Sequence, residues 1–311
     1  MSEQMSEDLK PVLITPEVLR ARPLPRPREG GDKEERGRVL VVGGGRETPG
    51  AVILAGVAAL RAGAGKLQIA TWGPSTPLVA AAIPEARVFA LPETKAGRLK
   101  KSAVEALEAH AGKAQAVCIG PGMIEDAAVL GFVKETLRLC REVPVVMDAG
   151  AAGCLSGGAE LLHSLGGRAV VTPNAEELAE IYGEEKGKIA GAPLEAARRA
   201  AGDFRAVVAL KGRETFIAAP DGRVLSNRAG SGGLATSGSG DVLAGVVAGL
   251  LARGAEPFDA AAWGVYLHAL AGEALAASVG PLGFLARELS REIPRLMAEL
   301  SSPKGGDSDE S

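Results

Sequence analysis

The stretch with the clearest chemical potential is the glycine-rich turn Thr236 to Asp241, which reads Thr-Ser-Gly-Ser-Gly-Asp. Glycine and serine let the backbone approach a phosphate closely, and a helix that follows such a turn begins with unpaired N–H groups. These donors and the helix dipole would stabilise charge on a transferred phosphoryl group, so Gly238, Ser239 and Gly240 form a candidate anion hole. Asp241 could accept the proton of an attacking hydroxyl. The turn therefore predicts phosphoryl transfer.

Asp241 also has a purely structural interpretation. Aspartate is among the residues preferred at helix N-caps, so Asp241 could simply cap the helix predicted over 242–252. Lys211 and Gly212 have two interpretations as well. They follow an apolar run, where Lys211 could approach a nucleotide phosphate or ribose, or could be a solvated lysine before a turn.

The other glycine-rich motif of this kind is weaker. Gly43-Gly44-Gly45 follows an apolar run, but the dinucleotide pattern G-x-G-x-x-G is incomplete because its third glycine position is Thr48. The lysine of the P-loop pattern is absent as well. A Rossmann dehydrogenase and a P-loop nucleotidase are therefore disfavoured.

Short aliphatic runs alternate with alanine-rich amphipathic stretches along the chain. The runs have little polar alternation, as strands covered on both faces do, and the stretches between them have helical spacing. Such alternation predicts a mostly parallel sheet with helices on both sides, a three-layer α/β/α domain. The predicted strands are 38–42, 67–71, 87–91, 116–119, 143–148, 169–172 and 206–210, a hairpin follows at 215–219 and 223–226, and the predicted helices are 51–62, 99–109, 127–139, 194–201, 242–252, 260–277 and 285–300.

Motifs at the ends of the predicted strands are the best candidates for a ligand site. In open α/β sheets, ligands bind beyond the carboxyl ends of the strands. The motifs at those positions are Gly43-Gly44-Gly45, Gly120-Pro121-Gly122, Thr172-Pro173-Asn174 and Lys211-Gly212.

Composition divides the chain into a central domain and two polar ends. Residues 1–36 are charged and proline-rich and are expected to be a tail and an extended entry segment, and 301–311 are expected to be a disordered polar tail. Residues 37–300 are long enough for one α/β domain.

The bulk numbers exclude several classes of function. The net charge of -3 gives no basic surface for nucleic acid, and no apolar run is long enough to predict a membrane span, so the cytoplasm is the expected compartment. The three cysteines have no disulfide or zinc spacing. No histidines are paired at metal-ligand spacing, so no protein-built metal site is predicted, and Mg²⁺ would be held by nucleotide phosphates and water. His268, within an apolar helix, is predicted to be a packed core histidine.

Taken together, these motifs resemble those of a known family. From about residue 36 to residue 300 the chain resembles the ADP/ATP-dependent NAD(P)H-hydrate dehydratases, metabolite-repair enzymes with a ribokinase-like fold that lacks the lid domain of the sugar kinases. The stretches that carry the resemblance are 37–44, 49–51, 58–65, 119–122, 210–215, 233–236, 238–241 and 264–268.

The resemblance implies a role for particular residues. Ala51, Gly122 and Asp241 would contact the hydrated dinucleotide, with Asn174 as a further binding contact. The adenine nucleotide, ADP or ATP, would contact Gly240 and the run Lys211, Gly212, Arg213, Glu214 and Thr215. Family members are commonly homo-oligomers, often tetramers, so a tetramer is one expected assembly. A fused epimerase domain is not recognisable, which favours a stand-alone dehydratase.

The chain departs from the family pattern in three places. Asn174 replaces the usual histidine after Thr-Pro, while Glu177 is retained; an asparagine can hydrogen-bond but cannot carry a proton near neutral pH. The usual Asp-Ala-Asp is Asp148-Ala149-Gly150, and the usual Asn-Pro is Ser231-Gly232. Thr-Pro-Asn also occurs in vitamin-precursor kinases of the same fold, so a small-molecule kinase is the alternative function. A non-catalytic nucleotide-binding protein is a third class, which an intact Asp241 disfavours.

Overall fold

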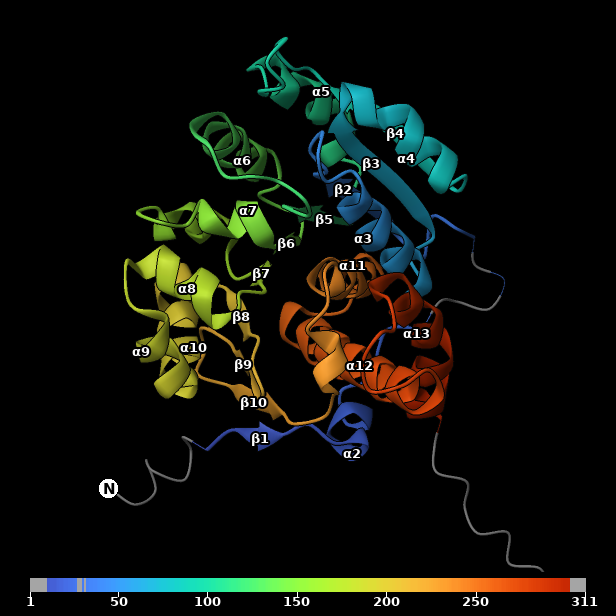
Figure 1. Cartoon of the computed structure of the whole chain (residues 1–311), viewed down its shortest axis with the longest axis vertical. Helices are drawn as coiled ribbons and strands as arrows, with labels where there is room; N and C mark the ends of the chain where they lie inside the picture. Colours follow the sequence, from blue (N-terminus) through green and yellow to red (C-terminus); the bar gives the residue numbers. More distant parts are fainter. Residues whose placement is uncertain (1–9, 27–29, 31, 303–311) are drawn as a thin grey trace, which may run out of the picture.

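The computed structural model describes residues 10–26, 30 and 32–302. A ten-stranded sheet forms the centre of the protein (Figure 1). Its strands lie in the order β1-β10-β9-β8-β7-β6-β5-β2-β3-β4. The strands β2 to β8 are parallel, and β9 and β10 form an antiparallel hairpin at one side. The strands are β1 Val12–Leu13, β2 Arg38–Val42, β3 Lys66–Trp72, β4 Ala86–Leu91, β5 Ala116–Ile119, β6 Val145–Met147, β7 Ala169–Val171, β8 Val207–Leu210, β9 Thr215–Ala218 and β10 Val224–Asn227. The predicted parallel sheet and its appended hairpin are confirmed.

Helices cover both faces of this sheet, and each face has its own hydrophobic core. One core is built with α3, α11, α12 and α13, and the other with α5, α6, α8 and α10, so the predicted three-layer arrangement is confirmed. The helices are α2 Pro16–Arg20, α3 Gly50–Arg61, α4 Thr76–Ala82, α5 Ser102–Ala111, α6 Ala127–Leu139, α7 Ala149–Gly153, α8 Ala175–Tyr182, α9 Lys186–Gly191, α10 Pro193–Phe204, α11 Ser239–Ala252, α12 Pro257–Ser278 and α13 Ala286–Ser301, with short 3-10 turns at Gly73–Ser75, Ala159–Leu165 and Gly232–Leu234.

Helix α11 is the most buried helix and sets the position of the glycine-rich turn. Its residues are apolar on every side, as expected for a helix inside the core. It packs closely along α3 because glycines replace side chains at the contact: a Cβ on Gly245 would overlap the carbonyl oxygen of Ala55. The start of α11 and the start of α3 are therefore held in a fixed relation.

Part of the segment expected to be an N-terminal tail belongs to the folded domain. Strand β1 pairs in parallel with β10, and Leu19 of α2 is fully buried. The indole Nε1 of Trp263 donates a hydrogen bond to the carbonyl oxygen of Arg22 at 2.7 Å. Residues 1–9 and 303–311, which make up much of the two expected tails, lie outside the described residues.

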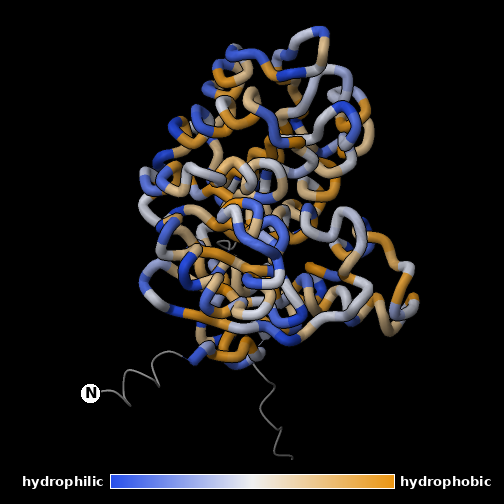
Figure 2. Tube along the Cα trace, turned by 60° about the vertical axis from the view of Figure 1, so that its left-hand side comes forward, coloured by the Kyte–Doolittle hydropathy of each residue, from blue (hydrophilic) through white to orange (hydrophobic). Residues whose placement is uncertain are grey.

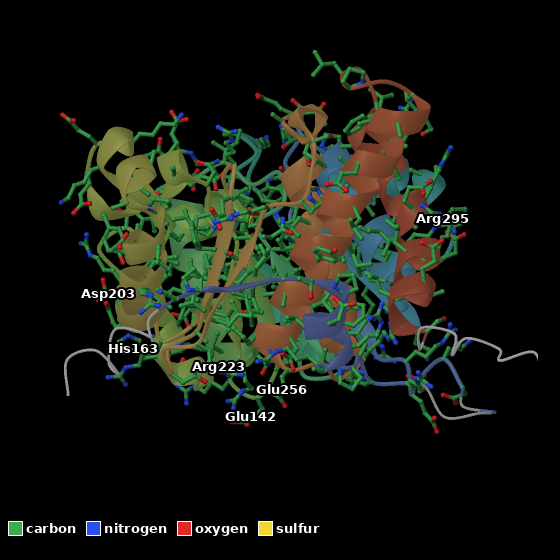
Figure 3. The ribbon with its side chains drawn as sticks, turned by 90° about the horizontal axis from the view of Figure 1, so that it is seen from below. Glu142, His163, Asp203, Arg223, Glu256 and Arg295 are labelled. Atoms are coloured by element: carbon green, nitrogen blue, oxygen red, sulfur yellow. The ribbon has the colours of Figure 1, made fainter. Side chains whose placement is uncertain are left out.

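Charged side chains lie mainly at the periphery, where they pair with one another. Arg295 and Arg223, for example, lie at the periphery (Figure 3). Arg295 on α13 contacts Glu292 and Glu299, and Arg223 contacts Asp221. Along the trace in Figure 2, apolar elements alternate with hydrophilic turns. Among the helices in the described part of the chain, none combines the length and the apolarity needed to span a bilayer.

Candidate functional site

The order in which the chain adds strands to the sheet reverses between β2 and β5, and this position is the switch point of the sheet. The chain runs outward from β2 to β3 and β4, then returns to place β5 on the other side of β2. Beyond the ends of these two strands, the N–H of Gly44 donates to Pro121 O at 2.8 Å, and Thr48 Oγ1 donates to Gly122 O at 2.6 Å. Such a switch point is where ligands bind in open α/β sheets.

Two predicted substrate contacts meet at this switch point. Gly122 has a φ of +66°, and a Cβ there would lie 2.8 Å from the Cβ of Ala51. Ala51 lies in the first turn of α3. A side chain at position 122 would therefore overlap Ala51 and the carbonyl oxygen of Thr48, so this position requires glycine.

The glycine-rich turn begins α11 in a way that leaves backbone donors unpaired. Gly238 is the N-cap, with a φ of +87°, and Asp241 is the third helical residue, so the interpretation of Asp241 as an N-cap is wrong. The N–H of Ser239 donates to Thr236 O at 3.2 Å. Within the described residues, the N–H groups of Gly240 and Asp241 have no hydrogen-bond partner. These two N–H groups can bind an anion at the start of the helix.

A group of charged side chains lies directly beside this turn. Lys211, just after β8, donates from Nζ to Asp148 Oδ1 at 3.3 Å and lies 3.7 Å from Glu177 Oε2. Thr172, just after β7, donates from Oγ1 to the same Asp148 oxygen at 2.7 Å. A Cβ on Gly240 would lie 3.4 Å from the Lys211 nitrogen and 3.6 Å from Asp148 Oδ2. The carboxyl ends of β6, β7 and β8 thus bring this charge cluster to the glycine-rich turn.

The cluster determines how the ionisable groups titrate. Burial alone would lower the pKa of Lys211, but the carboxylates of Asp148 and Glu177 outweigh burial and raise that pKa above its usual value. Burial raises the pKa of Asp241 to about 7, with a further contribution from the Asp148 carboxylate and an opposing one from Lys211. Asp241 can therefore exchange a proton near neutral pH, as a general base must.

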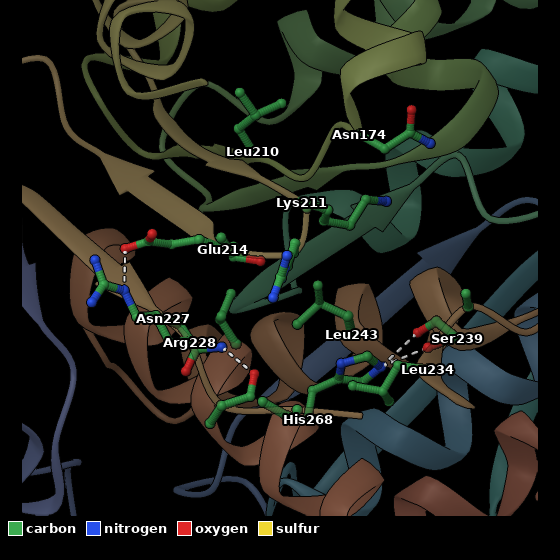
Figure 4. Close-up of a pocket in the computed structure, with 18 of the residues that line it drawn as sticks. Asn174, Leu210, Lys211, Glu214, Asn227, Arg228, Leu234, Ser239, Leu243 and His268 are labelled. Atoms are coloured by element: carbon green, nitrogen blue, oxygen red, sulfur yellow. Dashed lines mark hydrogen bonds and ion pairs between the residues drawn. The ribbon is translucent and has the colours of Figure 1, made fainter. Parts of the chain in front are cut away.

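A cavity of about 1430 Å³ opens next to the charge cluster (Figure 4). All of the residues predicted to bind the nucleotide line it: Lys211, Gly212, Arg213, Glu214, Thr215 and Gly240. Asn174, Ser239 and His268 line it as well, whereas Ala51, Gly122, Gly238 and Asp241 are not among its lining residues. The predicted nucleotide residues thus line one cavity. The predicted substrate residues divide: Asn174 lines the same cavity, whereas Ala51 and Gly122 lie at the switch point.

Asn174 also has a structural role, at the start of α8. It is the N-cap of α8, and its Oδ1 accepts hydrogen bonds from the N–H groups of Glu176 at 2.8 Å and Glu177 at 3.0 Å. In return, Glu177 Oε2 accepts from the N–H of Asn174 at 2.7 Å. This capping box commits Oδ1, so only the Nδ2 amide of Asn174 is available to a ligand.

Asn174→Ala is expected to lower the free energy of unfolding by about 1 kcal/mol, because the α8 cap is lost. Asn174→Ser should keep most of that stability, since serine retains a capping oxygen, but it removes the amide donor. Urea denaturation measures the contribution of the cap to the free energy of unfolding, and the KM for substrate measures the contribution of the amide to binding. Equal stability of the alanine variant and the wild type would contradict the capping role, and an unchanged KM in the serine variant would contradict ligand binding by the amide.

Three residues of the site had no chemical role assigned from sequence. Asp148 and Thr172 end the predicted strands 143–148 and 169–172, and Thr172 is part of the strand-end motif Thr172-Pro173-Asn174. His268 was predicted to be a packed core residue, yet its partly buried side chain reaches the cavity. The departure at Gly150 has a steric reason, because a Cβ there would overlap the carbonyl oxygen of Met123.

Known proteins share this sequence pattern. The sequence model of the NAD(P)H-hydrate dehydratase family matches residues 39–295. A relative from Xanthomonas campestris pv. campestris, described as an ADP-dependent (S)-NAD(P)H-hydrate dehydratase, is 46% identical over 294 residues, covering 94% of this chain and 97% of the relative.

Solved structures share the fold. A ribokinase-like superfamily protein from Enterococcus faecalis has a TM-score of 0.81 at 26% identity, covering 94% of this chain and 97% of its own. The ADP/ATP-dependent NAD(P)H-hydrate dehydratase of Bacillus subtilis, co-crystallised with ATP/Mg²⁺, has a TM-score of 0.76 at 28% identity, covering 94% of this chain and 99% of its own. The chain therefore belongs to the NAD(P)H-hydrate dehydratase family and has a ribokinase-like fold.

Proposed function

We propose that this protein converts (6S)-NAD(P)H hydrate back to NAD(P)H with ADP or ATP as the phosphoryl donor, and is thus a hydro-lyase of nicotinamide cofactor repair. The observation that carries the proposal is the position of Asp241. Its carboxylate has a pKa of about 7 and belongs to the same helical turn as the unpaired N–H groups of Gly240 and Asp241. A base and an anion site are thereby combined next to a cavity of nucleotide size.

The reaction follows from the chemistry of the hydrate. The substrate carries a hydroxyl at C6, beside the ring nitrogen, and hydroxide is a poor leaving group. Asp241 takes the hydroxyl proton while the oxygen attacks the terminal phosphorus of the nucleotide, whose bond to the bridging oxygen breaks. The ring nitrogen then supplies the electron pair that expels phosphate from C6. Loss of the C5 proton restores the reduced nicotinamide.

The other residues bind and position the two reactants. Lys211 and the run to Thr215 would hold the nucleotide phosphates and ribose in the cavity. Ala51 and Gly122 would admit the hydrated ring at the switch point, where a Cβ on Gly122 would overlap Ala51. The two N–H groups would stabilise charge on the phosphoryl group in transit, and such fixed donors usually supply a large share of catalysis.

Magnesium would enter with the nucleotide, as in the ATP/Mg²⁺ crystals of the Bacillus subtilis relative. Mg²⁺ is usually bound by phosphate oxygens, water and one or two carboxylates. Asp148 and Glu177, the carboxylates around Lys211, fit that pattern. Among the described residues, no group of three His, Cys, Asp or Glu side chains could hold a metal ion by itself. The bound ion would neutralise phosphate charge.

Absorbance at the reduced nicotinamide band provides the test. With NADH hydrate, Mg²⁺ and either ADP or ATP, the wild-type protein should restore that absorbance and release free phosphate. No recovery with either nucleotide would refute the proposed function. Parallel assays with NADPH hydrate and with each nucleotide would measure the preference of the enzyme.

A small-molecule kinase of the same fold is the second candidate, because Thr172-Pro173-Asn174 also fits such enzymes. The family match over residues 39–295 and the 46% identical relative favour the dehydratase. The products separate the two functions. A kinase would release a stable phosphorylated product, whereas the dehydratase releases free phosphate and reduced cofactor.

A further inference from the structure

His268 makes two contacts with the residue that begins α11. Its Nε2 lies 2.9 Å from Ser239 Oγ and 3.0 Å from the carbonyl oxygen of the same serine (Figure 4). Because His268 comes from α12, the contacts join two helices across 29 residues of sequence. Ser239 and His268 both line the cavity of about 1430 Å³ described above.

The pair of contacts determines the tautomer of the imidazole. A carbonyl oxygen can only accept a hydrogen bond, so Nε2 must carry the hydrogen; a lone pair on Nε2 would repel the carbonyl at this distance. Burial lowers the pKa of His268 to about 4, which keeps the ring neutral near pH 7 and leaves Nδ1 without a proton. The Nε2–H group is thus shared between the carbonyl oxygen and Oγ of Ser239, and Oγ acts as an acceptor.

This assignment leaves the hydroxyl hydrogen of Ser239 free. Among the described residues, Ser239 Oγ has no hydrogen-bond partner except His268. Ser239 is the first helical residue of α11, directly before the unpaired N–H groups of Gly240 and Asp241. A hydroxyl that accepts from a fixed donor can direct its own hydrogen to a nearby anion.

We propose that His268 is a positioning residue, which holds Ser239 so that its hydroxyl becomes a third hydrogen-bond donor to the phosphoryl group, beside the two backbone N–H groups. The proposal rests on the proposed function, because the phosphoryl group in transit is the ligand. It assigns a task to a histidine that is otherwise only a link between α11 and α12.

A purely structural link would behave differently from a positioning residue. If His268 only holds α12 against α11, its loss should lower stability and should act independently of the Ser239 hydroxyl. If His268 acts through that hydroxyl, the fold-losses of kcat/KM in the two single variants should not multiply in the double variant. A double-mutant cycle separates these cases.

The experiment compares Ser239→Ala, His268→Leu, His268→Gln and the double variant Ser239→Ala/His268→Leu. We expect about a hundredfold loss of kcat/KM in Ser239→Ala and in His268→Leu, as for removal of one oxyanion donor. The double variant should be no worse than Ser239→Ala within about threefold. His268→Gln places an amide donor near the position of Nε2 and should recover most of the activity. Ser278→Ala is the control and should match the wild type, because the exposed Ser278 hydroxyl donates to the carbonyl oxygen of Ala274 within α12.

Two further measurements keep the result independent of the overall reaction. The ¹⁵N chemical shifts of His268 should show a protonated Nε2 and an unprotonated Nδ1. Affinity for ATP with Mg²⁺, measured by calorimetry, should fall about tenfold in Ser239→Ala, as for a lost bond to a charged group. A wild type that binds ATP but does not restore NADH would overturn the proposed function alone.

Three outcomes would overturn the inference itself. The first is full kcat/KM and full ATP affinity in Ser239→Ala. The second is a double variant whose loss equals the product of the single losses. The third is a ring protonated on Nδ1 only. If His268→Leu does not fold, Ser239→Ala and His268→Gln still test the positioning role. The first variant removes only a hydroxyl, and the second keeps a hydrogen-bond donor at position 268.

Discussion

Asp241→Asn is expected to lower kcat/KM at least a hundredfold, because asparagine cannot take the proton of the C6 hydroxyl. In the wild type, kcat/KM should rise with pH through a midpoint near 7, since the base must be ionised and its pKa is about 7. A residual activity in the variant that keeps the same midpoint would show that another group is the base. A turnover equal to that of the wild type would contradict the general-base role altogether.

The same variant should be more stable than the wild type at high pH. The pKa of Asp241 is raised from 3.8 to about 7 in the folded protein, so the fold favours the protonated form, and this stabilisation is lost as the pH rises through 7. Asparagine is never charged, so the variant keeps this stabilisation at high pH. At pH 8 the gain in unfolding free energy should be on the order of 2–4 kcal/mol, and it should shrink as the pH falls towards 4. A loss of stability in the variant at pH 8 would contradict a carboxylate whose charged form is disfavoured by the fold.

Lys211→Met should have the second largest effect. The substitution keeps an apolar stem but removes the charge, so Asp148 and Glu177 lose their common cation. Asp148 is buried, so the loss of its cation leaves a buried charge uncompensated, and we expect about 3 kcal/mol lower stability at pH 8. Affinity for the nucleotide should fall, and kcat/KM should drop at least a hundredfold, because the phosphates lose a cation at the reacting end.

The variant should also move the pH profile. Lys211 lowers the pKa of Asp241, so its loss should shift the rising limb of kcat/KM above pH 7. Lys186→Met is the matched control, because Lys186 forms an exposed ion pair with Glu176, and such pairs contribute little. If the pH profile of kcat/KM does not shift in Lys211→Met and the affinity for ATP is unchanged, then Lys211 neither binds the nucleotide nor influences the pKa of Asp241.

Local sequence was sufficient for the strands and most of the helices of this protein. Aliphatic runs predicted β2 to β8 within about two residues, because a strand buried on both faces needs apolar residues at nearly every position. The helix 127–139 was predicted with the observed bounds. The hairpin at Pro220-Asp221-Gly222 was also predicted, because such residues turn the chain tightly.

Some local signals were present but were not used. Asn174 followed three residues later by Glu177 is the pattern of a capping box, and it marks the start of α8, which was not among the predicted helices. Asp148 ends a predicted strand, where a polar residue indicates a site. Both could have been found from the sequence.

The remaining features depend on contacts between distant segments. Residue types and spacing predicted a phosphate-binding turn, a candidate base and a parallel sheet, and the structure confirms the sheet. Only the tertiary structure decided that β5 returns beside β2, that Lys211 contacts Asp148, and that His268 contacts Ser239. Periodicity reports which face of a strand or helix is buried, but not which neighbour covers it. The order of the strands in the sheet, set by packing of the whole core, decides which strand ends meet and therefore what pKa Asp241 has.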